Sequence, residues 1–215
     1  MSDELNYLSK RVVKGLLNRR SFMGRAAALG VTLSVATGLL TSAARAAGPI
    51  KGGTIRAALP GGSTTDVLDP ALTTNSTGVA ILRLWGEPLV ELDADGGLEM
   101  RLADSFDSSP DATVWTFAIR SGVTFSNGKP LTPEDVAATL ERHAGEESKS
   151  GALGLLGDIQ KISVDGNNVV VELSSANADL PYLLTDYHLM IQPKGGKEDP
   201  NAAIGTGPYV LKEYE

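Results

Sequence analysis

Alternation of apolar and polar residues predicts a β-sheet in the middle of the chain. In the clearest stretch Trp115, Phe117 and Ile119 share one face, as expected of a half-buried strand. Turn-forming residues at 95–97 and 165–168 sit beside alternating stretches and predict hairpins. The predicted strands are residues 88–93, 114–120, 159–164 and 169–173.

Apolar residues at helical spacing predict helices between these strands. The strongest start signal is at residues 132–135, where Thr132 can cap, Pro133 suits the first helical position and the Asp135 carboxylate faces free amides. His143 falls at the end of this helix, where the dipole favours a cation, and a surface position is expected for it. The predicted helices are residues 77–85, 132–143 and 180–184.

Three further apolar stretches, at residues 54–59, 189–191 and 209–211, also predict strands. Residues 146–157 contain Gly and Ser and predict a mobile loop. The mixture of helices and strands favours an α/β (α+β) class. Because the last strand-like run stops at Glu215, an incomplete domain is expected.

Charge is unevenly distributed along the chain. The 215 residues include 19 basic and 26 acidic side chains and no cysteine. Seven basic residues and only two acidic ones fall within residues 1–46, so the remainder is strongly acidic. An acidic body argues against nucleic acid as a partner. The absence of cysteine excludes disulfides, thiolate metal ligands and a lipid-modified N-terminal cysteine.

The basic N-terminal stretch has the layout of an export signal. Arg19 and Arg20 are followed by Phe22, and residues 26–40 form an uncharged run that is short for a membrane span. This arrangement resembles a twin-arginine signal peptide. The alternative is a chance arginine pair before an ordinary amphipathic helix.

Cleavage is expected after an A-x-A sequence that ends at Ala46, which would make Ala47 the mature N-terminus. Residues 1–46 are therefore set apart as the signal peptide. The resemblance implies the twin-arginine translocase as an export partner and a periplasmic location.

Three later stretches resemble the peptide/nickel-type (family five) extracellular solute-binding proteins. Individually each is weak, but their order and spacing are specific and cover essentially all of residues 51–215. The stretches are Glu87–Asp93 with Leu102–Phe106, Trp115–Val136 (WTFAIRSGVTFSNGKPLTPEDV) and Ile204–Tyr209 (IGTGPY).

This resemblance implies a two-lobed periplasmic-binding-protein-like fold whose cleft closes on a ligand. Residues 51–74 and 186–215 correspond to part of the first lobe, and residues 75–185 to an inserted subdomain. The second lobe is expected to be absent. The implied function is the periplasmic substrate-binding component of an ABC transporter, binding peptides or similar small solutes. Its partners would be that solute and an ABC permease in the inner membrane, with the protein itself a monomer.

The resemblance also implies ligand-binding residues. In this family the segment after the Asp-Pro of the first loop contacts ligand, which here corresponds to Thr73, Thr74, Asn75 and Ser76. The alternative for this segment is a helix-capping stretch. A charged ligand group needs a charged partner, and Asp66, Asp69 or a residue of the second lobe could supply it. Two further candidates near the lobe crossing are Tyr187 and His188.

Competing functions are an enzyme, a binder of a nickel chelate or other non-peptide solute, and a truncated remnant that binds nothing. His143 and His188 are the only histidines, and no catalytic motif accompanies them. We therefore expect no catalysis, no cofactor and no directly bound metal. The specific ligand is not expected to be readable from these residues.

Overall fold

The computed structural model describes residues 3–47 and 52–214, which belong to two compact units, Met1–Ala57 and Ala58–Glu215. Lys51, the first residue of the predicted first lobe, and Glu215 lie outside the described residues. Each unit is described by itself. The predicted mixed α/β class is confirmed.

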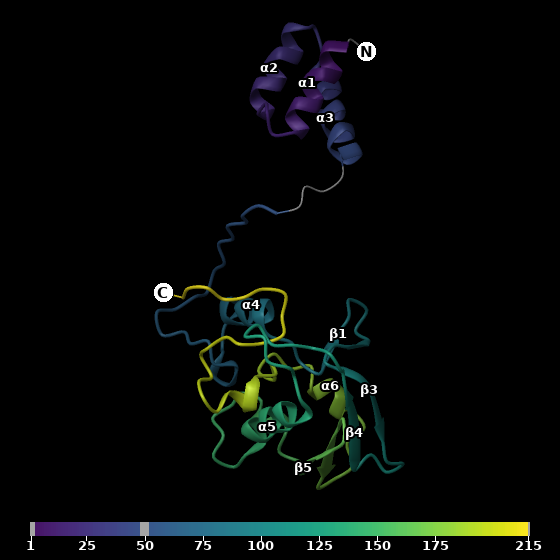
Figure 1. The fold of residues 1–215 in the computed structure, drawn as a ribbon, viewed down its shortest axis with the longest axis vertical. Coiled ribbons are helices and arrows are strands. Elements are labelled where there is room, and N and C mark those ends of the chain that lie inside the picture. The colour runs from purple at the N-terminus through teal and green to yellow at the C-terminus, as the bar shows by residue number, and fades with distance from the viewer. Residues whose placement is uncertain (1–2, 48–51, 215) are drawn as a thin grey trace. The chain divides into compact units, whose positions relative to one another are not determined.

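The N-terminal unit contains three helices, α1 (Asp3–Val13), α2 (Arg19–Ala28) and α3 (Leu33–Ala47) (Figure 1). Asn18 caps α2, because its side chain accepts a hydrogen bond from the backbone N–H of Ser21 at 2.8 Å. No helix in residues 3–47 or 52–214 is both long and apolar enough to cross a bilayer. The buried core of this unit consists of Leu5, Leu8, Phe22, Ala26 and Ala36.

An antiparallel four-stranded sheet organises the second unit, in the order β3-β4-β6-β5 (Figure 1). Trp115, Phe117 and Ile119 of β4 are buried on one face, as their alternation predicts. Val169 and Val171 of the neighbouring β6 lie opposite Phe117 and Trp115 and continue the same face. The strands are β3 (Ala103–Ser108), β4 (Val114–Ile119), β5 (Ile159–Asp165) and β6 (Asn168–Leu173).

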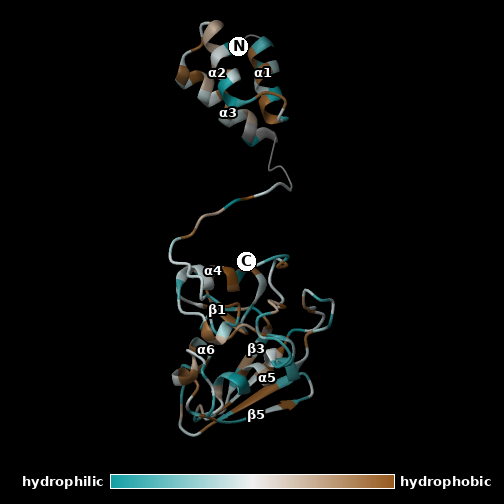
Figure 2. Cartoon of the chain, turned by 90° about the vertical axis from the view of Figure 1, so that its left-hand side faces the viewer, coloured by the Kyte–Doolittle hydropathy of each residue, from teal (hydrophilic) through white to brown (hydrophobic). Residues whose placement is uncertain are grey.

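Helix α5 (Pro133–Ala144) packs against β5 and β6. Figure 2 shows hydrophobic colouring in the strands beside α5, whose outer face is largely hydrophilic. The predicted start signal is present as a capping box, in which Thr132 Oγ1 accepts from the N–H of Asp135 and the Asp135 carboxylate accepts from the N–H of Thr132.

Shorter elements surround this core. They are the hairpin strands β1 (Val90–Leu92) and β2 (Leu98–Met100), helices α4 (Ser76–Trp85) and α6 (Leu180–Leu183), and the 3-10 helices η1 (Pro70–Leu72), η2 (Leu153–Leu155) and η3 (Pro193–Gly196). The turn expected at residues 95–97 joins β1 to β2. Strand β3, which comes directly after this hairpin in the sequence, was not among the predicted strands.

Three predicted strands are wrong. Residues 54–59, 189–191 and 209–211 form no β-ladder. A strand needs a neighbour for its backbone N–H and C=O groups. Residues 189–191 are buried, but their backbone bonds go to separate, non-strand partners: Leu189 N–H donates to Asp186 O and Ile191 N–H to Glu87 O. Tyr209 N–H donates to Leu84 O near the end of α4.

Two expectations near the end of α5 also need correction. His143 is fully buried rather than on the surface, and its Nδ1 lies 2.6 Å from Ser150 Oγ. The predicted loop of residues 146–157 has no strand or α-helix, but Ala152 and Leu156 anchor it in the core. This anchored loop covers the His143 ring, which explains why a helix-end position did not mean exposure.

Candidate functional site

The Asp66–Ser76 loop contains the first group of predicted ligand-binding residues. Two of its side chains cap helices, η1 within the loop and α4 at its end. Asp69 Oδ1 accepts from the N–H of Ala71 at the start of η1, and Asn75 Oδ1 accepts from the N–H of Gly78 at the start of α4, each at 2.9 Å. The capping role proposed as the alternative for this stretch is therefore present at Asn75.

Side chains from distant parts of the chain hold this loop. Arg142 Nη2 donates to both carboxylate oxygens of Asp69, at 2.7 and 2.6 Å. Asn201 Oδ1 accepts from the backbone N–H groups of Leu68 and Asp69, at 3.0 and 3.1 Å. The Asp69 charge is thus neutralised inside the protein, and the loop is fixed to α5 and to the C-terminal segment.

His188 connects the two groups of predicted ligand-binding residues. Its Nε2 lies 3.0 Å from the backbone oxygen of Thr73, and its Nδ1 lies 2.6 Å from Asp186 Oδ1. The Tyr187 ring lies against the imidazole, with 4.0 Å between ring centroids. His188 is buried, so both of its ring nitrogens face protein atoms.

The remaining predicted residues differ in exposure. Thr74 and Ser76 are exposed, Asn75 and Tyr187 are half-buried, and Thr73 is buried. The Ser76 hydroxyl donates to Pro60 O at 3.4 Å. A small cavity of about 80 Å³ opens beside these residues, lined by Thr65, Asp66, Val67, Leu72, Thr73, Thr74, Asn75 and Gly78.

Asp66 provides the negative charge at this cavity. Its Oδ1 accepts from Asn75 Nδ2 and its Oδ2 from the N–H of Ser63, both at 2.7 Å. In the part of the chain that the structure describes, no lysine or arginine forms an ion pair with Asp66. Of the two aspartates considered from the sequence, Asp66 therefore keeps an unneutralised carboxylate and Asp69 does not.

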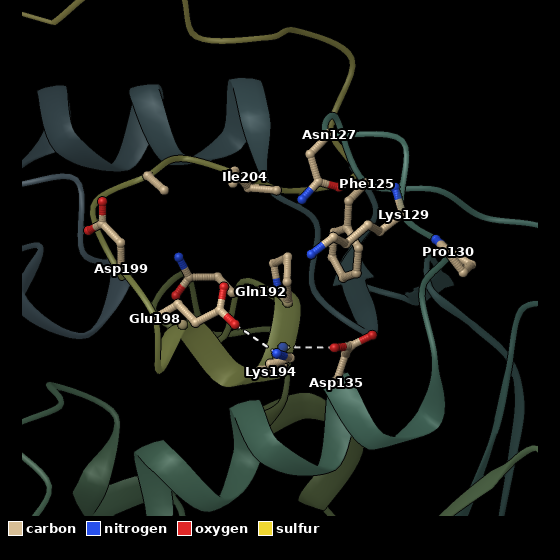
Figure 3. A pocket seen from close by; sticks show the side chains of 13 residues that line it. Phe125, Asn127, Lys129, Pro130, Asp135, Gln192, Lys194, Glu198, Asp199 and Ile204 are labelled. Carbon is tan, nitrogen blue, oxygen red and sulfur yellow. Dashed lines mark hydrogen bonds and ion pairs between the residues drawn. The ribbon is translucent and has the colours of Figure 1, made fainter.

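A second cavity, of about 150 Å³, lies between the turn at residues 125–130 and the segment around η3 (Figure 3). One ion pair lies in it, with Lys194 Nζ 2.7 Å from Glu198 Oε1. The backbone N–H of Lys194 also donates to Asp135 Oδ1 at 2.7 Å. Because this cavity contains none of the ligand-binding residues predicted from the sequence, the Asp66 cavity is the candidate site.

The predicted export signal lies in the N-terminal unit. Arg19 and Arg20 are exposed at the start of α2, and Phe22 is fully buried in the helical core. Ala46 and Ala47 are the last residues of α3, and their side chains lie outside the described part of the structure. The twin-arginine interpretation and the cleavage position remain predictions.

Sequence reasoning missed the residues that position the loop. Arg142, Gly151 and Asn201 contact it from 73, 80 and 132 residues away, and no local signal marks them. Gly151 donates its N–H to Ala71 O at 3.0 Å. Within residues 3–47 and 52–214, no group of three His, Cys, Asp or Glu side chains is arranged to hold a metal ion.

Comparison with known proteins gives consistent results. The glutathione-binding protein GsiB of Escherichia coli K12 is 29% identical over 190 residues, which cover 86% of this chain and 36% of the relative. The oligopeptide-binding protein OppA of Bacillus subtilis is 27% identical over 172 residues, which cover 69% of this chain and 32% of the relative. The chain thus spans about a third of the length of these two curated relatives, both of which are named as binding proteins.

The fold agrees with solved structures. The PBP AgaA from A. tumefaciens R10 in complex with agropinic acid matches with a TM-score of 0.63 and 29% identity, over 69% of this chain and 31% of that one. The family model "Bacterial extracellular solute-binding proteins, family 5 Middle" matches residues 97–215, more than half of the chain. The chain therefore belongs to the family 5 bacterial extracellular solute-binding proteins.

Proposed function

We propose that the chain forms part of the periplasmic substrate-binding component of an ABC importer, and that it binds peptides or similar small solutes at the Asp66–Ser76 loop. Family membership supports the class of function. The observation that supports the site is the Asp66 carboxylate, which has no ion-pair partner among the described residues and lines a cavity with Thr74 and Asn75.

The chemistry of this cavity suits one end of a peptide. An ammonium group gains a charge-assisted hydrogen bond from a carboxylate such as Asp66, and the hydroxyl of Thr74 and the amide of Asn75 can bond to peptide groups. Rigid anchoring by Arg142 and Asn201 keeps these groups in place, which reduces the entropic cost of binding. GsiB and OppA are named for glutathione and oligopeptides, and both of these ligands carry a free ammonium group.

The proposal is tested by calorimetric titration of the complete gene product with short peptides that have a free or an acetylated N-terminus. We expect Asp66→Asn to weaken binding of the free peptide about tenfold, because the variant keeps the shape and loses the charge. Asp107→Asn, an exposed aspartate on β3, is the matched control and should leave affinity unchanged. Equal binding of both peptides, or no effect of Asp66→Asn, would contradict the proposed site.

A nickel chelate or another non-peptide solute is a second candidate ligand. The agropinic acid complex of AgaA supports a non-peptide solute, and the Ni(L-His)2 complex of NikA from Staphylococcus aureus, at 25% identity, supports a nickel chelate. Affinity for such a solute that survives Asp66→Asn would favour it. The third possibility, a remnant without binding activity, predicts no heat with any solute. Periplasmic location and twin-arginine export belong to the same proposal. The intact mass of the periplasmic product tests the location and the cleavage before Ala47, which removes the first 46 residues, and loss of that product on changing Arg19 and Arg20 to Lys tests the twin-arginine route.

A further inference from the structure

Both ring nitrogens of His188 face groups that accept hydrogen bonds. Nδ1 lies 2.6 Å from a carboxylate oxygen of Asp186, and Nε2 lies 3.0 Å from the backbone carbonyl oxygen of Thr73. A carbonyl oxygen and an ionised carboxylate can only accept. Each contact is therefore a hydrogen bond only when the nitrogen on that side carries a proton.

A neutral imidazole has one N–H, whereas the imidazolium has two. Two acceptors therefore match the protonated ring. When one proton is lost, the remaining N–H stays with Asp186, because a hydrogen bond to a carboxylate is stronger than one to a neutral carbonyl. The Nε2 lone pair then faces the lone pairs of Thr73 O, and the contact across to the loop loses its donor.

The surroundings support the charged pair. Burial raises the pKa of Asp186, but hydrogen bonds from the side chain and backbone N–H of His188 outweigh burial and hold that pKa below its usual value, so the carboxylate is ionised. The Tyr187 ring lies against the imidazole, and an aromatic face attracts a cation.

Other charged or titratable groups near this pair are His143 and Arg142 on α5 and Asp69 on the loop. Burial, with the Arg142 charge, lowers the pKa of His143 to about 4, so at neutral pH it adds no second positive charge. The positive charge of Arg142 is matched by Asp69, to which it is hydrogen-bonded.

Gly151 makes the contact between His188 and the loop possible. A Cβ at this position would lie 2.4 Å from His188 Nε2 and 2.7 Å from its Cε1, so any side chain here would displace the imidazole. Gly151 also bonds to the loop directly, because its N–H donates to Ala71 O. The space at Gly151 thus brings the histidine and the Asp66–Ser76 loop together.

We propose that His188 is a positioning residue, which holds the Asp66–Ser76 loop through Thr73 when its ring is protonated and releases it as the pH rises. This inference rests on the proposed function only in treating the loop as a ligand-binding site, and its test uses no ligand. The loop is therefore held more firmly when both ring nitrogens carry a proton than when Nε2 has lost its proton.

The first test is the protonation state of the ring, measured by long-range ¹H–¹⁵N NMR on the untagged 215-residue chain. The chain has only two histidines, so His143→Gln leaves His188 as the only ring signal. We expect both ring nitrogens of His188 to be protonated at pH 5.5 and Nε2 to lose its proton at higher pH. A neutral ring at pH 5.5 would overturn the proposal.

The second test measures amide hydrogen exchange at Ala71, Leu72 and Thr73 between pH 5.5 and 8.5, corrected for the intrinsic effect of pH. In the His143→Gln chain we expect protection to fall about tenfold across this range. His188→Gln in that chain retains a neutral donor, so protection should persist and lose its pH dependence. The His188→Phe and Gly151→Ala variants should lack this protection at every pH.

Exchange that varies with pH equally in the His143→Gln chain and in the same chain carrying His188→Gln contradicts the proposal. If His188→Phe unfolds the chain, Gly151→Ala and the ring spectrum still decide it. No ligand is used in either test. If the loop depends on pH but the protein binds no peptide, the proposed ligand is contradicted and the proposed role of His188 is supported.

Discussion

Two regions of the second unit contain segments that the sequence predicts as strands, and only one of them forms a sheet. In residues 75–185, strand β4 pairs with β3 on one side and β6 on the other, and Phe117 is fully buried. In the C-terminal segment, residues 209–211 pair with no strand, and Tyr209 and Val210 are 59% and 64% exposed. The difference shows that an apolar, strand-like sequence does not determine whether a partner strand is present.

The energetic reason is that β-structure is stabilised between strands. Residues of β4 gain cross-strand contacts on the sheet face, where Trp115 lies opposite Val171 and Phe106 packs near both Trp115 and Phe117. Residues 209–211 make one backbone bond to the end of α4, and of their side chains only Leu211 packs against buried residues. The exposed side chains of Tyr209 and Val210 therefore contribute little to the stability of the unit.

The largest expected effect separates the two regions directly. Phe117→Ala leaves a cavity in the sheet core and should lower the free energy of unfolding by about 3–5 kcal/mol. Tyr209→Ala removes an exposed aromatic from the other predicted strand and should change it by less than about 1 kcal/mol. Urea denaturation of both variants measures this contrast.

A comparable loss of unfolding free energy for Tyr209→Ala would contradict the proposed difference between the two regions. It would mean that the C-terminal segment packs in solution against a surface that its exposure does not show. Comparable m-values for the two variants and the parent chain provide the control, because they show that the same surface unfolds in each case.

Sequence reasoning succeeded where neighbours along the chain decide the structure. The capping box at Thr132 and Asp135 and the hairpin around residues 165–168 depend on residues within a few positions of one another. It failed at His143, which sits at a helix end as predicted but is covered by the Ser150 loop. Whether a helix end is covered depends on packing, which local periodicity does not contain.

The candidate site divides in the same way. The capping role of Asn75 agrees with the alternative given for its segment. The contact between Thr73 and His188 and the roles of Arg142 and Asn201 were not predicted, because the partners are far apart in sequence. The family-like Gly205-Thr206-Gly207 stretch has a structural explanation here. A Cβ at Gly205 or Gly207 would lie within 2.6 Å of the Trp85 backbone, so these glycines allow close packing on the end of α4.

The next largest effect is the pH dependence of stability that a buried histidine, His143, gives to the sheet region. Burial is the main cause that lowers the pKa of His143 to about 4, from 6.5 in an unfolded chain. Below pH 6.5 the unfolded chain therefore binds a proton that the folded chain does not, and stability falls as the pH drops toward 4. At about 1.4 kcal/mol per pKa unit, the loss is on the order of 3 kcal/mol.

Thermal or urea unfolding at pH 7 and pH 4 measures this loss, and His143→Gln provides the matched control. Glutamine can still bond to Ser150 but does not titrate in this range. The variant should lose about 3 kcal/mol less than the parent between the two pH values. An unchanged acid dependence would mean that the ring is exposed in solution and that the loop of residues 146–157 is not anchored.

The smallest effect concerns the contact between the sheet region and the Asp66–Ser76 loop, where Arg142 of α5 binds Asp69. Arg142→Met leaves the Asp69 carboxylate, 8% exposed, without its cation and should cost about 1–3 kcal/mol. Adding Asp69→Asn removes the stranded charge and keeps an oxygen that can cap Ala71, so the double variant should be more stable than Arg142→Met alone. If both have equal stability in urea denaturation, the ion pair does not hold the Asp66–Ser76 loop to α5. The loop would then depend on Asn201 and His188 for its position, and α5 would stabilise it less than the contacts at Asp69 indicate.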